Sequence, residues 1–247
     1  MKRSIKAAAR AAILAATFAA TAPLANAKLL ITEAMPDPAG TDADREWFEI
    51  YNSGPTALNI GGYSVGDGLV STGTSSGEGL GTFPAGTTIA SGQVMIIAIR
   101  NAGFTSLFGA SHPGLNADFE FANPLGTSTT LADDPNVPNL PQRTGWGVSD
   151  ASLGMANGGD DVGIVDPDGN IVDMVSYGPS SMITSWADVA SATIQRIPAN
   201  QDTDTGAEWS YVTGLANSTP GTVAVPEPAS CWALGLAGLA VLRRRRR

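Results

Sequence analysis

Cysteine and histidine are almost absent from this sequence. The 247-residue chain has one cysteine, Cys231, and one histidine, His112. With a single cysteine no disulfide can form within the chain, so the fold must depend on its hydrophobic core. Zinc is left without its usual ligands, which are cysteine and histidine side chains. A serine-histidine centre would have to use His112, which lies in a loop-like Ser-His-Pro-Gly segment.

Basic residues are scarce in the middle of the chain. Residues 28–225 contain five basic and 22 acidic side chains, a net charge of −17, whereas the whole chain carries −9. Proteins bind nucleic acid largely through Lys and Arg contacts to phosphates. The sequence therefore predicts no nucleic-acid partner.

Two short hydrophobic runs could enter a membrane, and one lies near each end of the chain. At the N-terminal end, basic residues precede the apolar run 11–20, and Ala25 and Ala27 form a small-x-small cleavage pattern. The basic residues are Lys2, Arg3, Lys6 and Arg10. This arrangement predicts a signal peptide over residues 1–27, removed by signal peptidase to leave Lys28 first. The alternative is an uncleaved anchor, for which the run is too short.

At the C-terminal end, Pro226, Glu227 and Pro228 lead into a 14-residue apolar segment, 229–242, and then into five arginines. As a helix the segment would measure about 21 Å, which is less than the roughly 30 Å hydrocarbon core. The arginines would therefore snorkel and stay cytoplasmic. They are Arg243, Arg244, Arg245, Arg246 and Arg247.

Residues 223–247 resemble the PEP-CTERM sorting signal of Gram-negative bacteria, with the motif at 225–228. The resemblance implies transient insertion in the inner membrane, cleavage near the motif by an exosortase, and a final location at the cell surface or outside the cell. The alternative is a basic tail for nucleic acid, which the preceding apolar segment disfavours.

Between these ends, the sequence alternates in the way that β-strands do. Residues 46–52 alternate apolar and polar side chains before a turn, which predicts a half-buried strand with Phe48 and Ile50 in the core. Residues 28–35 and 58–65 are predicted to be strands, the first ended by Pro36. Residues 67–82 are rich in Gly, Ser and Thr and predict a flexible loop.

The second half of the chain continues this pattern. Residues 93–100 are apolar nearly throughout and predict a central strand, followed by one or two helical turns at 101–109. Residues 122–143 contain four prolines and no periodicity, and predict a long inserted loop. Asp-Pro-Asp-Gly-Asn at 166–170 predicts a hairpin turn between two strands.

Three motifs occur in the order found in one family. They are E-W-x-E-I-Y-N at 46–52, L-x-I-x-G-Y-x-V-x-D-G at 58–68 and F-P-x-G-T-x-I-x-x-G-x-V-x-I-I-A at 83–98. Together they resemble the lamin tail domain. The resemblance implies an all-β, immunoglobulin-like β-sandwich over residues 28–222, with the loop at about 122–143 inserted. Some lamin tails have been linked to DNA, but the acidic body argues against that activity here.

Catalytic chemistry is weakly represented. Ser64 lies in a G-x-S-x-G pattern, but a nucleophile elbow needs a following helix and a histidine base, and neither is predicted here. The lamin tail motif accounts for the same glycines. We therefore expect no enzyme and no required cofactor, with a hydrolase as the least favoured alternative.

Calcium is the metal that the composition best suits, because it binds carboxylates and carbonyls. The candidate ligands form three pairs: Asp160 and Asp161, Asp166 and Asp168, and Asp202 and Asp204. The alternative is that these aspartates stabilise turns. An EF-hand starting at Asp202 is excluded because its closing position falls on Thr213.

The tryptophans of the body offer a second binding hypothesis. Trp47, Trp146, Trp186 and Trp209 could form an aromatic strip for polysaccharide, although core packing is the commoner role in β proteins. The main expectation is an exported, non-enzymatic surface or matrix protein. The alternative is an extracellular module that binds polysaccharide or calcium.

Overall fold

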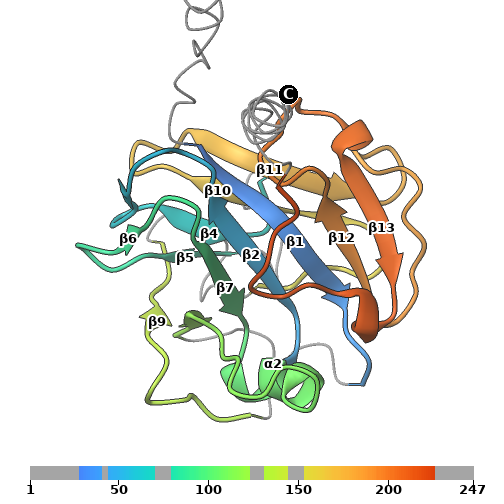
Figure 1. The fold of residues 1–247 in the computed structure, drawn as a ribbon, viewed down its shortest axis with the longest axis horizontal. Helices are drawn as coiled ribbons and strands as arrows, with labels where there is room; N and C mark the ends of the chain where they lie inside the picture. The colour runs from blue at the N-terminus through green and yellow to red at the C-terminus, as the bar shows by residue number, and fades with distance from the viewer. Residues whose placement is uncertain (1–27, 41–43, 70–78, 123–130, 144–152, 226–247) are drawn as a thin grey trace, which may run out of the picture.

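The described residues form a two-sheet β-sandwich with one short α-helix (Figure 1). A computed structural model describes residues 28–40, 44–69, 79–122, 131–143 and 153–225. The predicted signal peptide and most of the predicted sorting signal lie outside the described residues. Within the described part, no helix is both long enough and apolar enough to cross a membrane.

The larger sheet has seven strands. Their order is β13, β12, β1, β2, β7, β8, β9, antiparallel as far as β7 and parallel from β7 to β9. The strands are β13 (Trp209–Thr213), β12 (Ala192–Arg196), β1 (Leu29–Asp37), β2 (Trp47–Asn52), β7 (Val94–Ala98), β8 (Phe119–Phe121) and β9 (Asn139–Leu140). The predicted central strand at 93–100 is confirmed, because β7 pairs on both edges.

The smaller sheet has four strands in the order β11, β10, β4, β5, and a separate two-stranded ladder joins β3 to β6. The strands are β11 (Ile171–Tyr177), β10 (Asp160–Val165), β4 (Ser64–Gly66), β5 (Leu80–Thr82), β3 (Leu58–Asn59) and β6 (Thr88–Ile89). The predicted hairpin at 166–170 is confirmed, with Gly169 at φ +93° in the turn.

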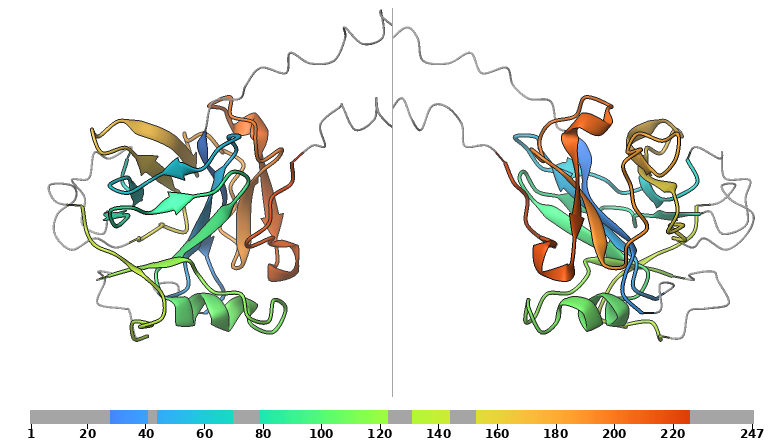
Figure 2. Two further views of the ribbon diagram at one scale, coloured as in Figure 1. Left: turned by 60° about the vertical axis from the view of Figure 1, so that its left-hand side comes forward. Right: turned by 90° about the vertical axis from the view of Figure 1, so that its right-hand side faces the viewer.

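The main core lies between the two sheets (Figure 2). Phe48 and Ile50 belong to it, as the alternation predicts. Other members come from both sheets: Leu29, Ile31, Ile97, Val65, Val162, Ile164 and Val175. A second cluster fills the outer face of the large sheet, where Phe104 and Phe108 of α2 (Asn101–Phe108) pack on Trp47.

Strand β2 differs from the half-buried strand that its sequence predicts. All six of its residues are buried. Trp47 is covered by α2, and Glu49 is covered by the last described segment of the chain, residues 218–225, which we call the C-terminal strap. The outer face of β2, which the alternation predicts to be exposed to solvent, is therefore covered by elements that are distant in the chain.

Four local predictions are corrected. The strand predicted at 58–65 is split into β3 and β4, because the chain turns at Gly62 (φ +88°) and passes from the β3–β6 ladder to the smaller sheet. Leu80 to Thr82 form β5 rather than part of a loop. Strand β1 continues past Pro36 to Asp37, which pairs with Ala192 beyond a bulge. The predicted insertion, described from residue 131, contributes edge strand β9.

Candidate functional site

Two groups of buried charged residues hold the two ends of the described chain. The first is centred on Arg196, the last residue of β12, whose side chain is 0% exposed. Its Nη2 lies 2.8 Å from both carboxylate oxygens of Asp173, in β11. Its Nη1 pairs with Glu208, and its Nε donates to the Ile31 carbonyl at 2.8 Å. A bidentate guanidinium–carboxylate pair is among the stronger charged hydrogen bonds.

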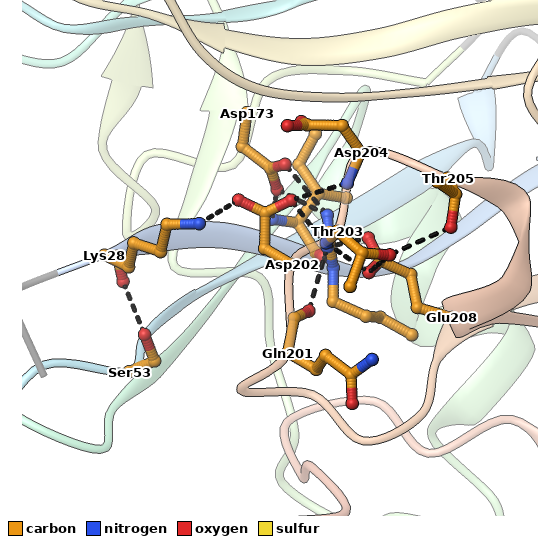
Figure 3. Close-up of polar contacts among 11 residues, drawn as sticks. Lys28, Ser53, Asp173, Gln201, Asp202, Thr203, Asp204, Thr205 and Glu208 are labelled. Atoms are coloured by element: carbon orange, nitrogen blue, oxygen red, sulfur yellow. Dashed lines mark hydrogen bonds and ion pairs between the residues drawn. The ribbon is translucent and has the colours of Figure 1, made fainter.

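Asp202 joins the same group from the loop that follows β12 (Figure 3). It lies 3.5 Å from Arg196 Nη1 and forms an ion pair with Lys28. The other oxygen of Glu208 accepts from the backbone and hydroxyl of Thr203, at 2.6 and 2.8 Å. We call Arg196 with Asp173, Asp202, Glu208 and Lys28 the arginine cluster.

Asp173 shows how the arginine cluster balances burial against charge pairing. Burial raises the pKa of Asp173 to about 6, although Arg196 and the hydrogen bond from the Ile31 amide oppose the increase. The carboxyl is therefore ionised at neutral pH, paired with a fully buried cation. The Trp209 ring covers the guanidinium, with its centroid 4.6 Å from Cζ.

The second group is Glu33 of β1 and Glu49 of β2, which we call the glutamate pair. The pairing register of β1 on β2 shifts between Ile31 and Glu33, which marks a β-bulge. The bulge places Thr32 and Glu33 together on the outer face, opposite Glu49. Both glutamates are 1% exposed.

Neutral donors, most of them from the C-terminal strap, bind the glutamate pair. Thr219 donates to Glu33 through its backbone N–H at 3.1 Å and through its hydroxyl at 2.8 Å. Gly221 donates its N–H to Glu49 at 3.0 Å, and Thr32 donates its hydroxyl at 2.8 Å. Gln195 adds an amide donor to Glu33 at 3.1 Å. The pair is the anchor that holds the strap on the sheet.

Burial dominates the electrostatics of the glutamate pair. Burial, then the nearby Glu33 charge, raise the pKa of Glu49 well above its usual 4.5, and hydrogen bonds from Thr32 and Gly221 oppose this. Burial also raises the pKa of Glu33, opposed by Gln195 and Thr219. A cavity of about 260 Å³ adjoins Glu49 beneath the strap and reaches Arg196.

The three predicted pairs of calcium ligands lie in different parts of the fold. Asp166 accepts from Asn170 and from the Asp168 amide within the hairpin turn, and the Asn170 hydrogen bonds lower the pKa of Asp166. Asp160 accepts from the Ala156 amide, and Asp161 from the Leu69 amide. Asp202 belongs to the arginine cluster, and Asp204 donates its backbone N–H to the carboxylate of Asp202. No group of three or more carboxylate, His or Cys ligands suits a metal ion among the residues described.

The other sequence candidates have structural partners. Ser64 is buried, 3.0 Å from the Thr82 hydroxyl and 3.4 Å from Arg143. His112 contacts Ser111 and the ring of Phe108. Ser64 and His112 are not partners of each other in these contacts.

The predicted aromatic strip is dispersed. Trp47 and Trp209 are buried, and Trp146 lies outside the described residues. Trp186 is half-buried, edge-on to Tyr177 and Tyr211, and donates its indole N–H to the Asn157 carbonyl. The predicted processing residues Ala25, Ala27, Pro226, Glu227, Pro228 and Arg243 to Arg247 also lie outside the described residues.

Comparisons with known proteins find two family matches and a similar solved structure. The Lamin Tail Domain family matches residues 22–179, and the PEP-CTERM protein-sorting motif matches residues 224–247. A similar solved structure is that of a DUF4876 family protein from Bacteroides thetaiotaomicron. It is 15% identical, has a TM-score of 0.47, and the alignment covers 82% of this chain and 75% of that one. No curated protein matches the chain.

The two family matches account for separate parts of the sequence. The first spans well over half of the chain and contains the strands of the small sheet and the centre of the large one. The second begins at residue 224, within the last two residues of the C-terminal strap, and it is a signal for export and exosortase processing. The chain belongs to the lamin tail domain family and carries a PEP-CTERM sorting motif at its C-terminal end.

Proposed function

We propose that this protein is an exported, non-enzymatic component of the cell surface or extracellular matrix. The observation that carries the proposal is the sorting motif at 224–247, which directly follows a folded body ending in the C-terminal strap. Signal peptidase would cut after Ala27, and an exosortase would remove the arginine-rich end. Residues 28–225 would remain as the mature protein.

The distribution of buried charge supports a structural rather than a catalytic role. In the arginine cluster the carboxylates are bound to Arg196 or Lys28. In the glutamate pair every oxygen accepts a hydrogen bond from a strap or sheet donor. Groups held in this way stabilise the sandwich, and a catalytic acid or base must instead face a substrate.

The acidic body fits the same proposal. A net charge of −17 on residues 28–225 keeps copies of the protein apart and soluble after release. No metal or organic cofactor is part of the proposal. Binding of polysaccharide or calcium stays a prediction of the sequence.

Intact-mass analysis of the protein purified from its own bacterium tests the proposal. The expected mass corresponds to a chain that starts at Lys28 and lacks Arg243 to Arg247. In a strain without exosortase, the same analysis should find the arginines still attached and the protein retained with the inner membrane. A surface-released protein that keeps its C-terminal arginines in the wild-type strain would overturn the proposal.

A further inference from the structure

Both ends of the described chain are fixed to one short segment, residues 198–202. Lys28 forms an ion pair with Asp202, and the Ala199 amide donates to the Ala224 carbonyl at 2.9 Å. Figures 1 and 2 show the two ends leaving the same end of the sandwich, with α2 at the opposite end. The signal peptide and the sorting signal therefore join the body at one place.

The connection from this place to the apolar segment is short. Val225 is the last described residue, and the apolar segment begins at Ala229. Four fully extended steps span at most about 14 Å. The headgroup layer occupies roughly 5–8 Å of that distance, since a bilayer about 40–45 Å thick has a hydrocarbon core of about 30 Å. The remaining gap is smaller than the roughly 10–12 Å diameter of a helix.

The apolar segment cannot relax this constraint by sliding outward. Its 14 residues, at about 21 Å as a helix, are already shorter than the hydrocarbon core. The arginines on its far side hold it from the cytoplasmic surface. Ala229 is therefore pulled toward the membrane, and the folded body is pulled with it.

The surface at this end has the chemistry of a membrane-facing patch. Ile197 and Val225 are 46% and 40% exposed, two of four large hydrophobic residues exposed in the described part of the chain. Ile197 lines one cavity with Ala199, Val223 and Ala224, so these apolar residues are neighbours.

An exposed cation lies beside these apolar residues. The Lys28 side chain is 49% exposed, and it forms an ion pair with Asp202. Asp204 is an exposed carboxylate nearby, with its amide bonded to Asp202. Lys28 is therefore the group at this end of the sandwich that can approach lipid phosphates.

We infer that this surface, made of Lys28, Ile197 and residues 223–225 and here named the exit face, rests against the phospholipid surface of the membrane that holds the sorting signal. Ile197 and Val225 contact the headgroup layer, and Lys28 approaches lipid phosphates. The inference rests on the proposed function, because the sorting signal supplies the tether.

The test uses the chain from Lys28 to Arg247 in vesicles of phosphatidylethanolamine and phosphatidylglycerol. Cys231→Ser removes the native thiol, and an environment-sensitive fluorophore is attached at Ile197→Cys or, as the matched control, at Ala110→Cys. Ala110 is exposed just after α2, at the opposite end. Quenching by lipids spin-labelled at the headgroup should be several-fold stronger at position 197 than at 110.

Two outcomes separate this inference from the proposed function. A chain that fails to float with the vesicles would overturn the tether itself and so the proposed processing route. A chain that floats, but whose fluorophores at 197 and 110 are quenched equally, would overturn the exit face alone. A long Gly-Ser spacer between Val225 and Pro226 should remove the difference, and a difference that persists unchanged would contradict the tether argument.

Discussion

The arginine cluster and the glutamate pair solve the same problem in different ways. Each buries carboxylates, those of the glutamate pair on the large sheet and those of the arginine cluster around Arg196 of that sheet, and each fixes one end of the described chain. In the arginine cluster a buried guanidinium and Lys28 supply opposite charge. In the glutamate pair the directly bonded partners are neutral N–H and O–H groups.

This difference decides which protonation state each group favours. Burial raises the pKa of Asp173 and of both glutamates, but at Asp173 the charge of Arg196 opposes the increase, whereas in the glutamate pair only hydrogen bonds from neutral donors oppose it. The arginine cluster should therefore be sensitive to loss of its cation. The glutamate pair should instead respond to pH, and removal of its charge should be tolerated at Glu49.

The largest expected effect comes from Arg196→Met. This change leaves three carboxylates without their central cation, and breaking a buried ion pair typically costs about 3–5 kcal/mol. Urea unfolding of the mature protein followed by fluorescence should show a loss of that size or no folded protein. Arg143→Met is the matched control, because half-buried Arg143 mainly donates to hairpin carbonyls and its loss should cost about 1 kcal/mol. Equal losses in the two variants would contradict the role given to Arg196.

A smaller loss is expected for Glu33→Gln. The amide group would replace one oxygen that accepts from both donors of Thr219, so at least one buried donor would lose its partner. Such a loss costs about 1–3 kcal/mol. Urea unfolding measures it, and Asp168→Asn in the exposed hairpin turn should change stability by less than about 0.5 kcal/mol. Unchanged stability of Glu33→Gln would show that Glu33 does not anchor the strap.

Glu49→Gln should leave stability at neutral pH unchanged or slightly higher. Its carbonyl can accept from Gly221 and its amide can donate to Thr32, which mimics the protonated acid. The folded pKa of Glu49 lies above 4.5, so the folded state holds this proton more tightly than the unfolded chain. Wild-type stability therefore gains from Glu49 as pH falls through the raised pKa toward 4.5, and loses that gain as pH rises.

The pH dependence of the difference between wild type and Glu49→Gln isolates this effect. The free energies of unfolding of both proteins should be measured from pH 4.5 to neutral pH. At neutral pH the variant should be the more stable protein, and at the acid end the wild type should be equally stable or more stable. A difference that does not change with pH would show that Glu49 keeps an ordinary pKa in the fold.

The smallest expected effect is that of calcium. The arginine cluster already contains its cation, and Asp160, Asp161 and Asp166 accept hydrogen bonds from backbone amides or Asn170. A site filled to a tenfold excess over its Kd would stabilise the protein by about 1.4 kcal/mol. Thermal unfolding with calcium and with a chelator should instead coincide. A calcium-dependent increase of that size, absent with magnesium, would restore the sequence prediction.

Local sequence predicted the strands well where all residues of a segment belong to one strand of one sheet. The 166–170 turn and its two strands follow from a run of turn residues between apolar segments. The same reasoning is wrong at 58–65, because the chain changes sheets at Gly62 and alternation does not reveal which sheet a residue joins. It also misses β9, whose two residues are a strand only because β8 lies beside them.

The candidate site was harder to predict than the fold. Arg196 stood out only as one of five basic residues in the body, next to the apolar Ile194 and Ile197. Glu33 and Glu49 looked like the solvated face of alternating strands. A charged residue inside a predicted strand indicates that a partner lies nearby if the residue is buried. The sequence spacing of Arg196, Glu33 and Glu49 could not identify those partners.

The sequence by itself determined the sorting motif, the excess of acidic residues and the family motifs, because each depends on contiguous residues or on composition. Only the tertiary structure decided which charges are buried and what neutralises them. Asp173 meets the Ile31 amide across 142 residues, and Glu33 meets Thr219 across 186. The physical reason is that desolvation and charge pairing depend on distance in space, which local patterns do not encode.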